Sequence, residues 1–236
     1  MRILALETTD TAGGVAALDG RKLLTWNDLE PQQRSAKALA PAIRNLWKEV
    51  GWKPTDTQLI AVAIGPGSFT GLRVGIATAK TLAYALKCEV LGVNTLHAIA
   101  SGIEQPIERL SVWMDAQREQ VFAATFHCTP GQIPEWIEPA RILDNATAIA
   151  QLQAGEKVAG PVLKKLGQQL PENVTSIDPS LWLPTATVIG QLAIQLYESG
   201  QRDDVWKLAP LYLRQSAAEE KWAKQTSLTS GTPPLP

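Results

Sequence analysis

The sequence predicts an α/β protein made of two structural units, each built from three strands, a helix, a strand and a helix. Three observations support this fold class. Short apolar runs alternate with stretches of helical periodicity up to about residue 94, the same order of elements restarts near Leu110, and 236 residues are enough for two hydrophobic cores. We place the units at residues 1–104 and 105–225, and expect the last helix of the smaller second unit to pack back on the first. Residues 226–236, rich in Ser, Thr, Gly and Pro, are predicted to be disordered.

The first unit opens with three predicted strands, at residues 3–8, 15–18 and 21–26. Asp19-Gly20 separates the second strand from the third, and this dipeptide is typical of two-residue hairpins because both positions tolerate a positive φ. Apolar residues then recur on one helical face up to Val50, and Gly51 can end that helix. Pro41 lies inside the pattern, so we expect a kink there or a helix that starts one turn later.

The continuously apolar run at residues 59–64 predicts a strand that is buried on both faces. A helix at 69–86 and a strand at 90–93 complete the first unit. The predicted strands of the second unit lie at residues 110–114, 121–126, 136–143 and 157–159, and its predicted helices at 146–152, 162–170 and 185–198.

Composition excludes several classes of protein. The formal net charge is -1, from 22 basic and 23 acidic residues, which lacks the basic excess of a self-sufficient nucleic-acid binder. Two cysteines and two histidines exclude a disulfide framework and a cysteine-rich zinc module. The chain reaches Glu7 after only four apolar residues, and no apolar run approaches the length of a membrane span. We therefore expect a soluble, cytoplasmic protein with no membrane partner.

The segment from Gly65 to Gly75 contains the most informative motif. A buried strand ends in a loop with two glycines, and Ser68 is a natural N-cap for the helix that follows. Backbone amides at such a helix start favour an anion. The glycine spacing fits neither a Walker A loop nor a dinucleotide fingerprint, because Thr70 stands where each motif needs another residue. Phosphate contact and a tight strand-to-helix crossover both remain open.

The end of the first strand has a similar pair of interpretations. The Glu7 carboxylate and the hydroxyls after it could accept a metal–phosphate group, or turn amides could satisfy the carboxylate. Asp115, at the end of a later strand, could likewise bind a ligand or pair with Arg118 or Arg73. The candidate phosphate-binding residues are Glu7, Thr8, Thr9, Gly65, Gly67 and Ser68.

Two stripes of residues run along the helix predicted at 69–86. Apolar residues spaced by three and four form a heptad-like seam, and Gly71 and Gly75 begin a stripe of small residues. Glycine inside a helix costs roughly 0.5–1 kcal/mol relative to alanine, so two of them suggest the close approach of another backbone. That backbone could belong to the sheet beneath or to another subunit. His97 and His127 lack the spacing of a metal site, and we predict no metal ligands and no catalytic residues.

Several motifs along the chain resemble those of one protein family. They are the first strand with Glu7-Thr8-Thr9, the GPGSFTGLR segment from Gly65 to Arg73, Ala79-Lys80, Gly92-Val93, Asp115-Ala116, and Pro210-Leu211-Tyr212-Leu213-Arg214. This set is similar to the bacterial TsaB (YeaZ) family, and the nine-residue GPGSFTGLR segment is the most specific part. The resemblance covers nearly the whole chain up to Arg214.

The resemblance implies a fold of the actin/Hsp70/sugar-kinase type, with two lobes. It also implies a role in making threonylcarbamoyl-adenosine next to the anticodon of tRNA. In that system a larger, related subunit, TsaD, carries the metal and the transfer chemistry. The smaller subunit dimerises with TsaD, and a small ATPase, TsaE, joins the pair.

We therefore expect a non-catalytic dimerisation subunit, with a homodimer when it is alone and tRNA contact mainly through the complex. The predicted partner-binding residues are Ser35, Leu39, Ile43, Gly71, Leu72, Gly75, Ile76, Ala79 and Ala83. No cofactor is firmly assigned, and ATP or ADP between the lobes or at the interface of the complex stays open. The alternative is an ATP-binding enzyme of the same superfamily, a small-molecule kinase or an ATPase.

The sequence departs from the family pattern at four positions. Glu7 stands where the family has Asp, which puts a kinase-like metal–nucleotide contact in doubt. Arg34 replaces a common His, Gln117 precedes the usual Arg, and Phe122 replaces a Tyr.

Overall fold

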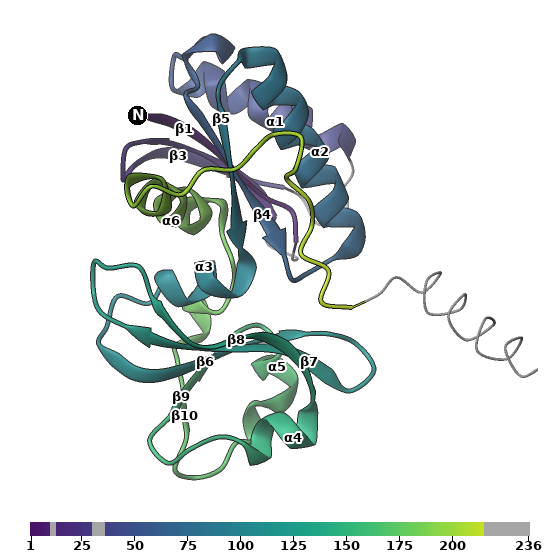
Figure 1. Ribbon diagram of the computed structural model, residues 1–236, viewed down its shortest axis with the longest axis vertical. Helices are drawn as coiled ribbons and strands as arrows, with labels where there is room; N and C mark the ends of the chain where they lie inside the picture. The colour runs from purple at the N-terminus through teal and green to yellow at the C-terminus, as the bar shows by residue number, and fades with distance from the viewer. Residues whose placement is uncertain (10–12, 30–35, 215–236) are drawn as a thin grey trace, which may run out of the picture.

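The computed structural model describes residues 1–9, 13–29 and 36–214, so the tail predicted at 226–236 lies outside the described residues. The described chain forms two α/β units stacked end to end (Figure 1). Each unit has one five-stranded mixed sheet as its centre.

The N-terminal sheet has the strand order β3-β2-β1-β4-β5. β2 pairs antiparallel with β1 and β3, whereas β4 pairs parallel with β1 and β5. Its strands are β1 (Arg2–Glu7), β2 (Gly14–Asp19), β3 (Lys22–Asp28), β4 (Leu59–Gly65) and β5 (Glu89–Asn94). The helices of this part of the chain are α1 (Ala36–Glu49), α2 (Phe69–Leu86) and α3 (Thr95–Ser101), with a 3-10 turn at Pro54–Asp56.

The C-terminal sheet repeats that arrangement, with the order β10-β9-β6-β7-β8. The first three strands again form an antiparallel meander, and the next two join parallel on the other side. The strands are β6 (Ile107–Asp115), β7 (Gln120–Cys128), β8 (Glu135–Asp144), β9 (Lys157–Ala159) and β10 (Thr175–Ser176). The helices are α4 (Asn145–Ala150), α5 (Leu163–Leu166) and α6 (Ala186–Glu198), with 3-10 turns at Gly167–Gln169 and Pro179–Leu181. The shared strand order confirms the predicted two-unit α/β fold.

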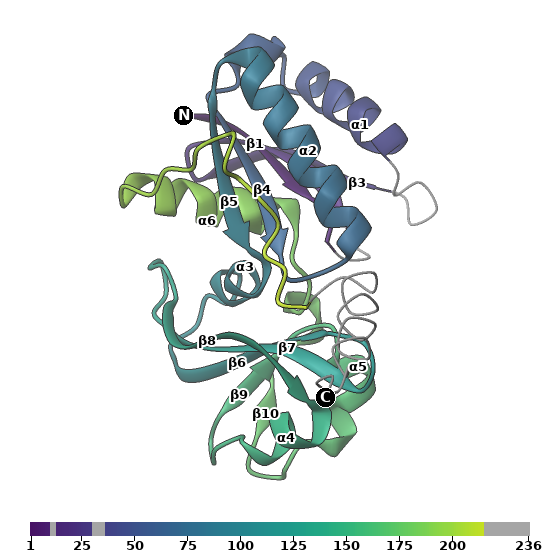
Figure 2. The same ribbon diagram turned by 45° about the vertical axis from the view of Figure 1, so that its right-hand side comes forward.

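Helices cover both faces of the N-terminal sheet (Figure 2). Alternate residues of β1 point to opposite faces, so Leu4 and Leu6 pack with α1 and α2, while Ile3 and Ala5 pack with α6. α3 lies between the two sheets and contributes Leu96 to the C-terminal core. On the same helix, the ring of His97 stacks 5.4 Å from that of Phe126, and burial lowers the pKa of His97.

α6 returns from the second unit to the first, where Gly190 makes its close approach possible. A Cβ at Gly190 would lie 2.4 Å from Leu18 Cδ1. After α6, residues 201–214 run back along α2 without forming a helix or strand, and we call this segment the strap (Figures 1 and 2).

Two local expectations differ from the structure. α1 runs without interruption through Pro41, which is exposed on the second turn of the helix. The helix predicted at 162–170 is only the four-residue α5, followed by a 3-10 turn that begins at Gly167. Glycine has a low helix propensity, which is consistent with the end of α5 at this residue. In the part of the chain that the structure describes, no helix combines the length and the apolar character needed to cross a bilayer.

Candidate partner-binding site

Thr8, just after β1, contacts the glycine stripe of α2. A Cβ at Gly71 would lie 1.8 Å from the Thr8 carbonyl oxygen, and one at Gly75 would lie 2.3 Å from Thr8 Oγ1. The Thr8 hydroxyl also donates a 2.8 Å hydrogen bond to the Gly71 carbonyl. The backbone whose approach requires these glycines therefore belongs to this chain and not to another subunit.

The apolar seam of α2 is buried by the same packing. It lies against the N-terminal sheet together with apolar residues of α1. A side chain that is at most 4% exposed in its own chain has almost no surface left for a partner. The prediction that such residues bind a partner is therefore corrected: they are core residues of this chain. The corrected residues are Leu39, Ile43, Leu72, Ile76, Ala79 and Ala83, together with the buried Gly75. Ser35 lies outside the described residues.

The candidate phosphate-binding residues lie on two segments that pack against each other. The Ser68 amide donates to the Thr9 carbonyl at 2.9 Å, and a Cβ at Gly67 would lie 2.6 Å from Thr9 Cβ. Ser68 Oγ caps α2 by accepting from the Gly71 amide at 3.3 Å. A phosphate at this turn would have to replace the hydrogen bonds of Ser68. Phosphate binding by these residues remains a prediction.

Glu7 is fully buried beneath this turn. Its carboxylate accepts hydrogen bonds from the Thr9 amide and, at 2.7 Å, from the Thr9 hydroxyl. Both bonds go to Oε1, so turn donors satisfy that oxygen of the carboxylate, as one of the two interpretations expects.

Asp115 is part of a similar local arrangement at the β6–β7 turn. Lys165 Nζ lies 2.6 Å from its carboxylate, and the Gln117 amide donates to the same group at 2.7 Å. Burial acts to raise the pKa of Asp115, but the bonds from Lys165 and Gln117 outweigh it and hold the pKa below its ordinary value. The observed ion pair thus involves Lys165, where the sequence analysis named Arg118 or Arg73.

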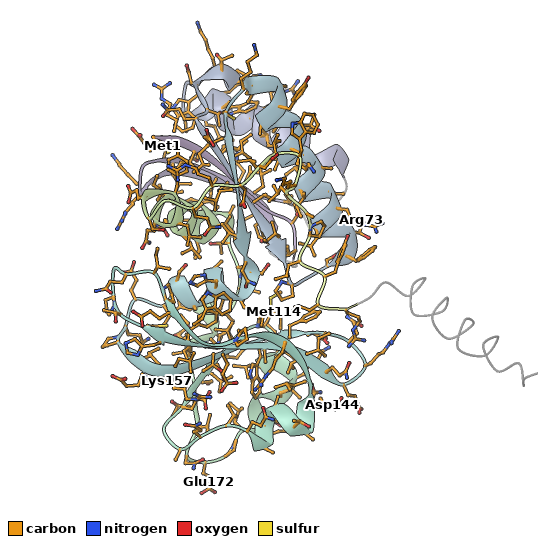
Figure 3. The ribbon with its side chains drawn as sticks, viewed as in Figure 1. Met1, Arg73, Met114, Asp144, Lys157 and Glu172 are labelled. Atoms are coloured by element: carbon orange, nitrogen blue, oxygen red, sulfur yellow. The ribbon has the colours of Figure 1, made fainter. Side chains whose placement is uncertain are left out.

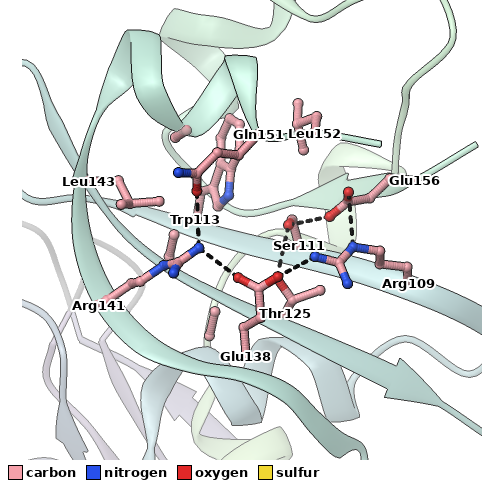
Figure 4. Close-up of a pocket in the computed structure, with 13 residues that line it drawn as sticks. Arg109, Ser111, Trp113, Thr125, Glu138, Arg141, Leu143, Gln151, Leu152 and Glu156 are labelled. Atoms are coloured by element: carbon pink, nitrogen blue, oxygen red, sulfur yellow. Dashed lines mark hydrogen bonds and ion pairs between the residues drawn. The ribbon is translucent and has the colours of Figure 1, made fainter. Parts of the chain in front are cut away.

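A cluster of charged side chains lies between the C-terminal sheet and α4 (Figure 4). Arg109 bridges Glu138 and the buried Glu156, and Ser111 donates to Glu156 at 2.5 Å. The adjacent cavity measures about 30 Å³, which is room for a water molecule or two. The groups of the cluster bond to one another and join β6, β8 and the segment before β9.

The outer side of α2 has a different character, because large aromatic side chains are exposed there. Four of the eight exposed large hydrophobic residues in the described chain lie on α2 and the strap, and we call them the aromatic face. They are Phe69 (37% exposed), Tyr84 (66%), Trp206 (69%) and Tyr212 (42%). Phe69 begins α2 and Tyr84 lies in its last turn, about 22 Å further along the helix axis, so the rings line the length of the helix. Exposed aromatic side chains are enriched at protein–protein interfaces.

Specific contacts hold these rings in place. The Phe69 and Tyr212 rings stack with their centroids 4.9 Å apart, and Arg73 lies 4.0 Å over the Phe69 ring while donating to the Tyr212 hydroxyl at 3.0 Å. Figure 3 shows Arg73 on the outer side of α2. Further along the helix, the Tyr84 and Trp206 rings meet edge to face at 5.3 Å. The face is therefore composite, with two rings from α2 and two from the strap.

Sequence reasoning missed this face because α2 and the strap, which each supply two of its rings, are more than 100 residues apart in the sequence. One signal was present: Arg73 and Tyr212 both lie in motifs that carry the family resemblance. Within residues 1–9, 13–29 and 36–214, no three His, Cys, Asp or Glu side chains gather as a metal site would need.

Comparison with known proteins gives consistent matches over most of the chain. The family model described as "TsaD: tRNA N6-adenosine threonylcarbamoyltransferase" matches residues 30–222. The tRNA threonylcarbamoyladenosine biosynthesis protein TsaB of Bacillus subtilis is 29% identical over 231 residues, covering 94% of this chain and 98% of the relative. The TsaB of Escherichia coli is 28% identical over 229 residues, with the same coverage of 94% and 98%.

Solved structures give the same result for the fold. YeaZ from Pseudomonas aeruginosa is 28% identical, with a TM-score of 0.77 over 90% of this chain and 99% of that chain. The activator of 2-hydroxyisocaproyl-CoA dehydratase from Clostridium difficile is 8% identical, with a TM-score of 0.50 over 84% of this chain and 95% of that chain, a likeness in fold alone. The expected two-lobed, actin-like architecture is confirmed.

Because Thr8 lies against Gly71, we expect a larger residue at position 71 to destabilise the fold. Gly71→Ala should lower the free energy of unfolding by about 1–3 kcal/mol, because the new methyl group would overlap the Thr8 carbonyl. Gly167→Ala is the matched control, since Gly167 has φ -57° and nothing within 4 Å of an added Cβ. Urea unfolding measures both variants, and equal stabilities would contradict the contact.

Proposed function

The chain belongs to the TsaB (YeaZ) family, and from that premise we propose that it is a non-catalytic dimerisation subunit in tRNA threonylcarbamoyladenosine biosynthesis. Its partner in this proposal is a TsaD-like catalytic subunit, which transfers the threonylcarbamoyl group to adenosine next to the anticodon. The aromatic face on α2 and the strap is the observation that supports the proposal most. It offers four exposed rings along the outer side of a helix whose inner side, from Leu72 to Ala83, is packed in the core of its own chain.

The family match supports a partner that is itself related to this chain. The transferase model covers residues 30–222, so a catalytic subunit of that family shares this architecture. Two related chains can pair through equivalent surfaces around an approximate twofold axis, as identical subunits do. The outer side of α2 has the exposed Arg73 and no acidic residue, so a partner surface with apolar side chains and hydrogen-bond acceptors would complement it.

The proposed homodimer rests on the same face. Alone, the chain would use it to form a homodimer, and a catalytic subunit would compete with that second copy. A TsaE-like ATPase would join the pair, and tRNA would be bound mainly through the complex, since a net charge of -1 leaves few phosphate contacts. Glu7 supports the non-catalytic role, because its carboxylate is buried and bonded to Thr9.

Truncation of the exposed rings tests the proposed surface. Tyr84→Ala should weaken binding to the catalytic subunit by at least about tenfold, because an aromatic ring near the centre of an interface contributes on the order of 1.4 kcal/mol or more. Trp26→Ala is the control, since Trp26 is 56% exposed on β3 and lies outside the aromatic face. Affinity is measured by titration calorimetry. Equal affinities for the two variants would remove the support for this surface.

Activity of the separate subunits tests the non-catalytic role. The purified chain, given tRNA and an activated threonylcarbamoyl donor, should form no modified adenosine, and activity should require the catalytic subunit. Mass spectrometry of the digested tRNA measures the product. Steady formation of threonylcarbamoyl-adenosine by this chain alone, lost in Glu7→Ala, would show instead that the chain is an enzyme.

A further inference from the structure

Two side chains of α2 donate hydrogen bonds to the strap: Arg73 donates to the Tyr212 hydroxyl, and Lys80 donates to the strap backbone. Lys80 Nζ donates to two strap carbonyls, that of Trp206 at 3.1 Å and that of Leu208 at 3.0 Å. The lysine ammonium group has three N–H donors and sits on a flexible side chain. It can therefore bind several backbone carbonyls of a segment without regular structure. Leu208 is then 7% exposed and packs into the core of the N-terminal unit.

Other bonds fix the strap on either side of Lys80. The Asp203 carboxylate accepts from the Gly92 amide at 2.8 Å, and the Leu211 amide donates to the Ile64 carbonyl at 2.7 Å. The far end reaches the C-terminal unit, where Leu213 packs on the core and Arg214 donates to the Gln120 side chain. The strap therefore spans both units.

Half of the aromatic face depends on where the strap lies. Phe69 and Tyr84 are placed by α2, whose inner side is fixed in the core. Trp206 and Tyr212 are placed by the strap, and the Lys80 bonds lie at and just after Trp206. If the strap left α2, the stacking between Phe69 and Tyr212 and the contact between Tyr84 and Trp206 would both be lost.

We propose that Lys80 is a positioning residue for partner docking: it holds the strap on α2, so that Trp206 and Tyr212 complete the surface to which the catalytic subunit binds. The inference rests on the proposed function, and it adds that the two hydrogen bonds from Lys80 help to hold the strap segment that supplies half of the docking surface. Lys80 itself is half-buried, and its ammonium group points to the strap carbonyls that it binds.

Lys80→Met tests this role because methionine keeps an unbranched apolar stem and removes the three donors. Amide hydrogen exchange of residues 201–214 should become faster, and the dissociation constant for the catalytic subunit should rise at least tenfold. Lys80→Arg should restore part of both, since it keeps a cationic donor. Lys164→Met, a change at an exposed lysine of α5, should alter neither.

The readouts separate the failure of this inference from the failure of the proposed function. Wild-type exchange in the strap of Lys80→Met, or faster exchange with wild-type affinity, would overturn the role of Lys80. If Tyr84→Ala also bound with wild-type affinity, the proposed function would fail with it. If Lys80→Met does not fold, Lys80→Gln, which keeps a polar side chain but loses the charge and reach of the ammonium group, replaces it, and the same two measurements decide.

Discussion

The approach of Thr8 to the glycine stripe of α2 is the constraint on which the rest of the structure depends. The Thr8 hydroxyl bonds to the Gly71 carbonyl, and neither Gly71 nor Gly75 has room for a Cβ. The start of α2 is thereby held against the end of β1, and the apolar seam of the helix closes the core over the sheet. One side of α2 is committed to its own chain, which leaves the opposite side for a partner.

The two units of the duplicated architecture are connected at several places. Both sheets have the same strand order, yet α6 returns to the first unit, α3 packs between the sheets, and the strap joins the two units again. At the end of β1, where the sequence analysis left a phosphate contact open, Glu7 and Thr9 bond to each other and the glycine loop packs on Thr9. The positions that carry the family resemblance thus organise a turn and a surface: Arg73 orders the rings, and Lys80 holds the strap.

Much of the fold could be predicted from the sequence because its signals are local. Asp19-Gly20 indicates the hairpin between β2 and β3. The apolar run of β4 indicates a buried strand, and Ser68 indicates the start of α2. The site could not be predicted in the same way. Both stripes of α2 fit a core or an interface equally well by periodicity, and only the position of Thr8 decides between them. The contact of Lys80 with Trp206 joins residues 126 positions apart, so no local pattern shows it.

The central claim is that the outer side of α2 and the strap, and no other exposed aromatic patch, binds the catalytic subunit. Hydroxyl-radical footprinting, read by mass spectrometry with and without that subunit, measures the exposure of each aromatic side chain. The account predicts that the oxidation of Tyr84, Trp206 and Tyr212 falls several-fold in the complex, while that of Trp26 and Trp136 does not change. Protection of Trp26 or Trp136, with Tyr84 and Trp206 oxidised as in the free chain, would contradict it.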